Sequence, residues 1–247
     1  MIYTEQVTGF GLSPDKKTLA VAHGSNIQTY KTSDWQSRTL DGLKSTPHGS
    51  SLTHRWNDMV SLRFLDGSKT AEFNDKDNWV SARFSPSGKL LAIGTNDDKV
   101  RYFKNPLEGD AALIGEQEGK FHQEGGRIHS CWCPDNKNGD FNLVKLNNKV
   151  MVYKVTQEGV TLDSELEHDG DICDFTFCHH GKFLLVGTNK DTYSVWMFAE
   201  RKKIKDIEGV AFSSQHHTNF RATFAPDNHA VALMGDDGKK CFIYDTA

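Results

Sequence analysis

The chain has 247 residues, a formal net charge of −4, 37% hydrophobic side chains and 25% charged side chains. This composition is ordinary for a globular protein, and it argues against a generally basic surface for nucleic acid and against an acidic tail. No apolar run approaches the roughly 20 residues needed to span a bilayer, and the N-terminal sequence MIYTEQVTGF lacks the features of a signal peptide. Five cysteines without a Cys-x-x-Cys spacing indicate a reducing, intracellular location, cytoplasmic or nuclear.

One pattern recurs along the chain: an apolar strand, a tight turn, a second apolar strand, another turn, and a third strand that ends on an aromatic residue. Pro-Asp, Ser-Gly and Asp-Asp-Gly supply the turns. In chain order the six copies begin at Phe10, Ser45, Ala82, Cys131, Phe175 and Thr223. Their closing aromatic residues lie 34 to 50 residues apart, at Tyr30, Phe64, Phe103, Tyr153, Trp196 and Tyr244.

A fourth and more polar strand fits into the connections between these copies. Polar composition suits the outermost strand of a sheet, because an exposed strand edge must resist pairing with other chains. We predict fourth strands at 36–40, 69–73, 111–115, 161–166 and 203–207.

Six units of about 40 residues, each with four strands, resemble the WD40-type β-propeller family. The resemblance rests on the Ser-Pro-Asp/Ser-Gly turn, the Leu-Leu-Ala-x-Gly-Thr strand, the Asn/Asp turn and the closing aromatic residue, and it covers nearly the whole chain. It implies an all-β fold: a six-unit propeller of four-stranded blades in a single domain over 1–247. The approximate repeats are 6–40, 41–73, 74–115, 116–166, 167–207 and 208–247.

The N-terminal residues 1–5 are expected to supply the missing outer strand of the last repeat, which would close the ring. An open or partial propeller that another protein's blade completes is the alternative, because seven blades are common in the family. Deleting residues 1–6 and measuring thermal stability distinguishes the two.

The chain departs from the fuller WD40 signature, which has a Gly-His before the innermost strand and a Trp-Asp at the end of the third. Only Tyr244-Asp245 approximates Trp-Asp. His168 resembles the histidine of Gly-His, and the resemblance implies that Asp191 and Trp196 join it in a buried, structural hydrogen-bond network.

Motifs of enzyme chemistry are missing: the sequence has no P-loop, no Gly-x-Ser-x-Gly elbow and no His-Glu-x-x-His. Cys131 and Cys133 point to one face of a strand and are interpreted as small buried residues, not as a metal or redox pair. Turn aspartates such as Asp98 and Asp191 are interpreted as backbone choices, since turns favour Asp and Asn. We therefore expect no enzyme activity, no cofactor and no metal site.

The expected function is a non-catalytic protein–protein interaction scaffold that binds peptides or partner proteins on one rim of the propeller, within a multiprotein complex. Residues just before the innermost strands, or in the turns after the second strands, should face that rim. Six of them are candidates for partner binding: Trp79, Arg127, Asp171, Phe220, Asp97 and Lys190.

Two other functions stay open at this point. The chain could be a structural subunit of a coat, pore or cytoskeletal complex that shares blade edges, a hypothesis motivated by the six-unit count. It could also be a propeller enzyme with a metal in the central channel, for which Asp97, Asp98, Asp191, Asp236 and Asp237 lie in comparable turns.

Overall fold

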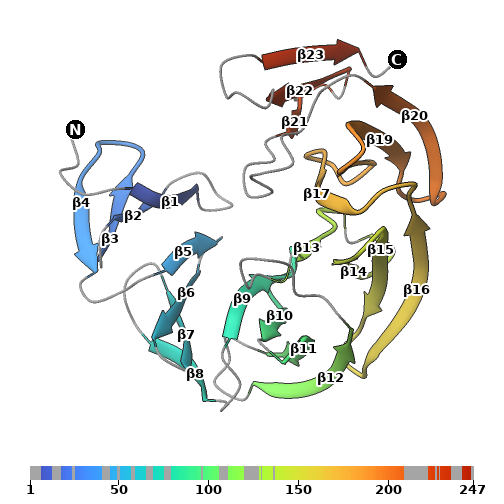
Figure 1. Cartoon of the computed structure of the whole chain (residues 1–247). Helices are drawn as coiled ribbons and strands as arrows, with labels where there is room; N and C mark the ends of the chain where they lie inside the picture. The colour runs from blue at the N-terminus through green and yellow to red at the C-terminus, as the bar shows by residue number, and fades with distance from the viewer. Residues whose placement is uncertain are drawn as a thin grey trace. The chain divides into compact units, whose positions relative to one another are not determined.

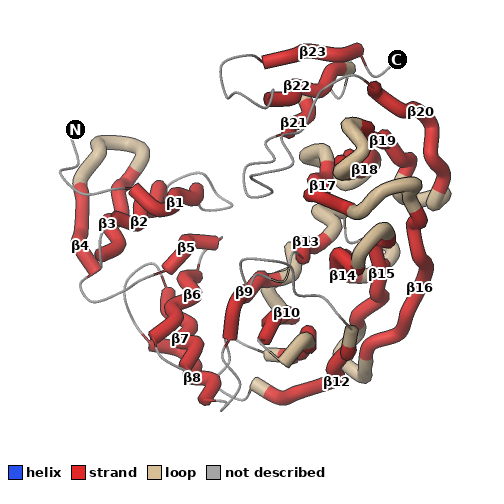
Figure 2. The backbone as a smooth tube through the Cα atoms, in the orientation of Figure 1, coloured by secondary structure: helices blue, strands red, loops and turns tan. Residues whose placement is uncertain are grey.

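The structure is a computed structural model, and it describes residues 7–12, 18–23, 26–40, 45–48, 51–56, 59–64, 69–74, 79–95, 97–105, 111–119, 128, 130–135, 137–208, 222–225, 227, 229–234 and 241–245. Every regular element within these residues is a β-strand (Figure 2). The chain divides into two compact units, one formed by 1–117 with 124–127 and the other by 118–123 with 128–247. We describe each unit by itself.

The first unit contains three four-stranded sheets in which each strand pairs with its neighbour in the chain (Figure 1). The first sheet consists of β1 (Val7–Leu12), β2 (Thr18–His23), β3 (Asn26–Lys31) and β4 (Ser37–Leu40). The second consists of β5 (Ser45–His48), β6 (Ser51–Trp56), β7 (Met59–Phe64) and β8 (Lys69–Asn74). The third consists of β9 (Trp79–Phe84), β10 (Leu90–Thr95), β11 (Lys99–Lys104) and β12 (Ala112–Glu118).

The second unit contains two four-stranded sheets and one sheet of three described strands. The first consists of β13 (Ser130–Trp132), β14 (Asp140–Leu146), β15 (Lys149–Val155) and β16 (Val160–Glu167). The next consists of β17 (Ile172–Phe177), β18 (Phe183–Thr188), β19 (Thr192–Met197) and β20 (Lys202–Glu208). The last consists of β21 (Ala222–Phe224), β22 (Ala230–Met234) and β23 (Cys241–Asp245).

The all-β fold of four-stranded antiparallel sheets is thus confirmed. Each predicted fourth strand is observed as the outer strand of its sheet: β4, β8, β12, β16 and β20. Residues 1–5, the predicted closing strand, lie outside the described residues.

Strand composition explains the order of strands within a sheet. All six residues of β10 are buried, as expected for an apolar strand covered on both faces. The residues of the outer strands β12 and β16 are instead mostly exposed or partly buried, with Leu166 of β16 the buried exception, because one long edge of each strand has no described pairing strand in its sheet.

Sheet β17–β20 is packed on both faces by its neighbours in the second unit. Leu184, Val186 and Trp196 join a buried cluster with Leu143 and Val152 of sheet β13–β16. The alternate residues of the same strands face the other way, into a second cluster with sheet β21–β23; these residues are Leu185, Tyr193 and Val195. Sheet β17–β20 therefore shares one apolar cluster with each of its two neighbouring sheets.

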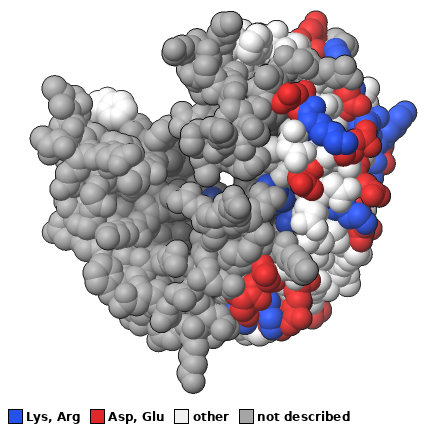
Figure 3. Space-filling view, in the orientation of Figure 1, with Lys and Arg blue, Asp and Glu red and all other residues white. Residues whose placement is uncertain are grey.

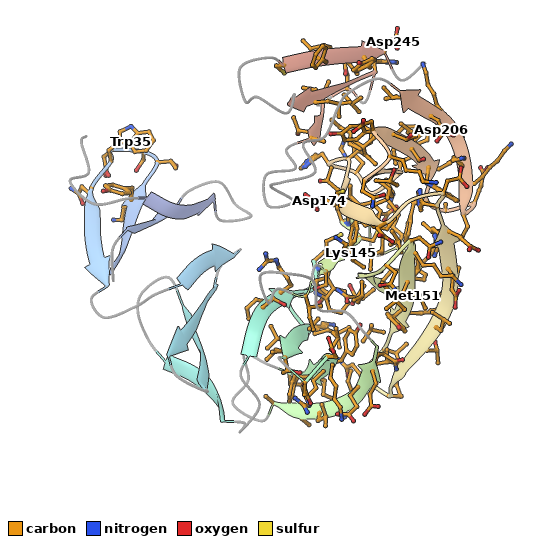
Figure 4. The ribbon with its side chains drawn as sticks, in the orientation of Figure 1. Trp35, Lys145, Met151, Asp174, Asp206 and Asp245 are labelled. Carbon is orange, nitrogen blue, oxygen red and sulfur yellow. The ribbon has the colours of Figure 1, made fainter. Side chains whose placement is uncertain are left out.

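Polar contacts also join the inner strands of sheets β13–β16 and β17–β20. Lys145 on β14 is only 5% exposed, and its Nζ donates to the carbonyl of Cys173 on β17 at 3.1 Å (Figure 4). Burial lowers the pKa of the Lys145 ammonium. Cys133 is buried and Cys131 packs against the same cluster, in agreement with their interpretation as small core residues.

Candidate functional site: a polar pocket beside His168

A pocket of about 640 Å³ lies at one end of sheet β17–β20. The loop after β16 and the turn between β18 and β19 meet there, because the first residue of β17 pairs with the last residue of β18, Ile172 with Thr188. We call this end of the sheet the loop edge. The pocket is lined by Glu167, His168, Asp169, Thr188, Lys190, Asp191, Thr192, Ser194, Lys203 and Asp206.

The pocket begins where the apolar face of sheet β17–β20 becomes polar. Along β18, the residue that follows Leu184 and Val186 on the same face is Thr188. Along β19, Trp196 is in the apolar cluster, while Ser194, two residues before it, lines the pocket. The same face of β18 and β19 therefore carries apolar residues in the buried core and polar residues, Thr188 and Ser194, in the pocket.

Asp206 is one carboxylate of the pocket, and it lies on the outer strand β20 (Figure 4). Ser194 Oγ donates to its Oδ1 at 2.6 Å, and Lys203 Nζ donates to its Oδ2 at 2.8 Å. Burial raises the pKa of the Asp206 carboxyl, but the hydrogen bonds from Lys203 and Ser194 outweigh it and hold the pKa below its usual value. Asp206 is therefore ionised at neutral pH.

His168 and Trp196 form a buried ring pair at the inner side of the pocket. They are 7% and 8% exposed, and their ring centroids lie 5.3 Å apart at an interplanar angle of 56°. Among the described residues, neither His168 Nε2 nor Trp196 Nε1 has a hydrogen-bond partner. Burial lowers the pKa of His168 to about 4, and the charge of Lys203 acts in the same direction, so the imidazole is neutral at neutral pH.

The three residues for which the sequence predicts a hydrogen-bond network lie near this pocket, but Trp196 Nε1 and His168 Nε2 have no partner among the described residues, so that network is not seen there. His168 and Asp191 line the pocket, and Trp196 packs against His168. Asp191 has a φ of +56° in the β18–β19 turn, and Asp98 has a φ of +62° at the matching position of the β10–β11 turn. Asp is among the residues that best tolerate this left-handed conformation, which gives a backbone reason for both aspartates.

The loop after β16 is fastened to the β18–β19 turn by direct hydrogen bonds. The backbone N–H of Asp171 donates to Asn189 Oδ1 at 3.0 Å, and the N–H of Asn189 donates to the carbonyl of Asp171 at 2.9 Å. The fit around Gly170 is tight, since a Cβ there would lie 2.7 Å from Asn189 Oδ1. Asp171 and Lys190 are both exposed, so two of the predicted partner-binding residues share the loop edge.

Of the other predicted partner-binding residues, only Asp97 has a described side chain. Asp97 belongs to the first unit, where it accepts hydrogen bonds from the Thr95 hydroxyl and from Arg101 Nη2, the latter at 2.9 Å. Trp79 begins β9, but its side chain lies outside the described residues, as do Arg127 and Phe220.

Sequence reasoning missed most of the pocket: Glu167, Asp169, Thr188, Thr192, Ser194, Lys203 and Asp206. Alternation along TYSVWM places Ser194 on the face of Trp196 and could have revealed it. Asp206 could not be placed in this way, because a register shift between Val195 and Trp196 changes the pairing of β19 with β20.

Within the described parts of the chain, no group of three or more His, Cys, Asp or Glu residues is arranged to hold a metal ion. No helix long and apolar enough to cross a membrane is found there either.

Comparison with known proteins identifies the fold. No protein-family profile matches the chain, and no curated protein matches it in sequence. The crystal structure of Hsv2 from Kluyveromyces marxianus, a β-propeller protein, superimposes with a TM-score of 0.68 at 11% sequence identity, over 98% of this chain and 73% of that one. The fold of this chain is therefore that of a β-propeller.

Proposed function

We propose that this protein is a non-catalytic interaction scaffold that binds peptides or partner proteins at the loop edge of sheet β17–β20. The observation that carries the proposal is the pocket itself. It is large enough for one or more side chains of a partner, and the exposed Asp171 and Lys190 stand at the same edge. The reducing location indicated by the cysteines supports a role in the cytoplasm or nucleus.

The six sheets support the further proposal that the chain is a divergent six-bladed propeller of the WD40 type. Their strands follow the sequence repeats, and five of the sheets have their outer strand in the connection where it is predicted. The role of residues 1–5 as a closing strand is tested by deleting residues 1–6. An unchanged unfolding temperature would show that this segment does not hold the fold together.

A structural subunit is the second candidate, and one observation favours it. Ile243 on β23 is 76% exposed and Phe242 is 36% exposed, and β23 has no further described neighbour in its sheet. Exposed apolar side chains on a strand edge are suited to pairing with another chain. In that case partners would depend on Ile243 and not on the loop edge.

Affinity capture from native lysate, followed by mass spectrometry, separates the two candidates. One bait is the intact chain and another carries Asp171→Lys and Lys190→Glu. The matched control carries Glu158→Lys and Lys202→Glu, which make the same charge changes at exposed positions that do not line the pocket. The scaffold proposal expects a discrete set of proteins that only the loop-edge variant loses.

Retention of the same set by the loop-edge variant would overturn the proposal for this edge. A further bait with Ile243→Asp then tests the structural-subunit alternative, which expects the set to be lost with that variant alone.

A further inference from the structure

The pocket carries more negative than positive charge. Its charged side chains are four carboxylates, Glu167, Asp169, Asp191 and Asp206, and two ammonium groups, Lys190 and Lys203. His168 adds no charge at neutral pH, because burial and the charge of Lys203 keep its imidazole neutral. An incoming cationic group would therefore meet a net negative surface, whereas an anion would be repelled.

The four carboxylates differ in the hydrogen bonds and ion pairs that they already make within the protein. Asp206 is engaged by Ser194 and Lys203, so the Lys203 charge is largely neutralised within the pocket. Glu167 and Asp169 flank His168 and are both exposed, and within the described residues neither carboxylate makes a hydrogen bond or an ion pair. Two adjacent carboxylates at the mouth of the pocket are thus available to an incoming donor.

His168 provides a second and independent sign of a missing donor. His168 is one of the lining residues and is more than nine-tenths buried, and its buried Nε2 has no hydrogen-bond partner in the described part of the chain. A buried polar atom without a partner costs about 1–3 kcal/mol, so such atoms are rare unless a ligand completes them. With its proton on Nδ1, the neutral ring offers Nε2 as an acceptor.

We propose that the pocket receives the basic side chain, Arg or Lys, of a partner protein segment; this inference rests on the proposed function. The carboxylates of Glu167 and Asp169 accept its N–H groups, and His168 Nε2 accepts a further one deeper in the pocket. Charge-assisted hydrogen bonds of this kind are stronger than neutral ones, and the planar guanidinium of Arg presents several donors in a fixed geometry. Arg is accordingly preferred over Lys.

Peptide pools of defined charge test the proposal on the full chain. Each pool is a fluorescein-labelled peptide with randomised flanks around one fixed position, which is Arg, Lys, norleucine or Glu. Fluorescence anisotropy measures the dissociation constants. We expect the Arg and Lys pools to bind at least about tenfold more tightly than the norleucine and Glu pools, and their binding to weaken as ionic strength rises.

Variants assign that binding to the pocket. The double variant Glu167→Gln with Asp169→Asn is expected to bind the Arg pool about tenfold more weakly than the wild type does. The control, Glu158→Gln with Glu200→Gln, removes two exposed carboxylates elsewhere and is expected to bind like the wild type. All four side chains are exposed, so an unchanged unfolding temperature confirms that each variant folds.

The outcomes separate this inference from the proposed function. Tightest binding by the Glu or norleucine pool, abolished by Asp171→Lys with Lys190→Glu, would overturn the basic-side-chain inference and leave peptide binding at the loop edge intact. Binding of the Arg pool that is unaffected by Glu167→Gln with Asp169→Asn would overturn the assignment to these carboxylates. Binding of none of the pools would overturn both proposals for this pocket.

Discussion

At the scale of single residues, two turn glycines differ in why a side chain at their position would be unfavourable: one for its backbone conformation alone, the other also for close packing. Gly88 and Gly181 each precede a lysine at the first turn of a repeat, with φ values of +71° and +70°. A Cβ on Gly88 would meet no described atom within 4 Å, whereas a Cβ on Gly181 would lie 2.7 Å from the backbone N of Asp135 and 3.0 Å from Cys133 Sγ. Position 181 thus requires glycine for two reasons: its backbone is left-handed, and its neighbours leave no space for a Cβ.

We expect Gly88→Ala to lower the free energy of unfolding by about 1 kcal/mol, the cost of a left-handed alanine. Gly181→Ala should cost about 3 kcal/mol, because the strain of a backbone clash is added. Urea denaturation of both variants measures the difference. Equal losses would show that the turn at Asp135 moves aside freely.

The buried imidazole of His168 makes stability depend on pH. Its pKa is about 4 in the folded chain and 6.5 without burial, so below pH 6.5 the unfolded chain binds a proton that the folded chain resists. The contribution of the neutral His168 to the free energy of unfolding is therefore complete above pH 6.5 and is lost as the pH falls from 6.5 towards 4. The loss amounts to at most about 3.5 kcal/mol, since a pKa difference of one between the folded and unfolded chain corresponds to about 1.4 kcal/mol.

Urea denaturation at several pH values, on the wild type and on His168→Gln, checks this prediction. Glutamine does not titrate, so the variant should lose less stability between pH 6.5 and 4. The lowered pKa of Asp206 acts in a more acidic window, because its contribution is lost only as the pH falls from its unfolded pKa through its folded pKa. Parallel stability profiles for the two proteins would contradict the burial of a neutral His168.

The backbone role of the turn aspartates could be predicted from the sequence, whereas the bonding of Asp97 could not. Asp98 and Asp191 show the left-handed φ that explains Asp in such turns. Asp97 has the same sequence signal, but it bonds Arg101, whose side chain is only 10% exposed. Such a pair depends on which side chains β10 and β11 place next to the turn, and no spacing of residues in the sequence reveals it.

At the scale of elements, Arg201 connects two sheets of the second unit. It lies in the turn between β19 and β20, and its guanidinium stacks over the ring of Phe198 at 3.9 Å and over Phe141 of β14 at 5.0 Å. Its Nη2 and Nε donate to Asp163 Oδ2 on β16 at 2.8 and 3.0 Å. The guanidinium of Arg201 thus donates hydrogen bonds to Asp163 and stacks its flat face on Phe198 and Phe141.

We expect Arg201→Lys to lower the free energy of unfolding by about 1–2 kcal/mol, because lysine keeps the charge but loses the stacking and the paired donors. Lys202→Arg, a substitution at the next and exposed position, is the control and should change stability by less than about 0.5 kcal/mol. Thermal and urea unfolding measure both. A loss no larger than that of the control would mean that the charge alone matters.

The example of Arg201 shows where sequence reasoning about elements stops. The outer strands were predictable because a polar segment in each connection needs only composition and spacing to be recognised. In the basic run Arg201–Lys205, Lys202 and Lys203 are exposed on β20, as suits the charge of an outer strand. Arg201 differs because Phe141 and Asp163, some 60 and 38 positions earlier, come beside it only after the sheets pack.

The charged groups of the pocket were hidden from sequence reasoning for a related reason. On the face that Figure 3 shows, basic and acidic side chains are interspersed among the described residues. Glu167 and Asp169 adjoin His168 in the chain, but Lys203 and Asp206 arrive from another strand through a shifted register. The repeats in the sequence therefore predict a binding scaffold, but the charged residues of the pocket can be recognised only in the folded structure.

At the scale of the whole molecule, the sequence predicts one domain over 1–247, and the structure contains a separate apolar cluster in each of its two units. Leu91 is fully buried with Phe84 and Ile93 in the first unit. Leu185 is fully buried with Val195 and Leu233 in the second. Truncation of either leucine to alanine removes core contacts and should cost about 2–5 kcal/mol.

If the chain is one domain, Leu91→Ala and Leu185→Ala lower the midpoint of the same transition, because all repeats unfold together. Urea unfolding followed in parallel by tryptophan fluorescence and far-ultraviolet circular dichroism makes the measurement, and coincident curves from the two probes are expected for each variant. Two transitions, one moved only by Leu91→Ala and the other only by Leu185→Ala, would contradict the single-domain prediction. The units would then be independent folding units, and the pocket beside His168 would depend for its stability on the second unit alone.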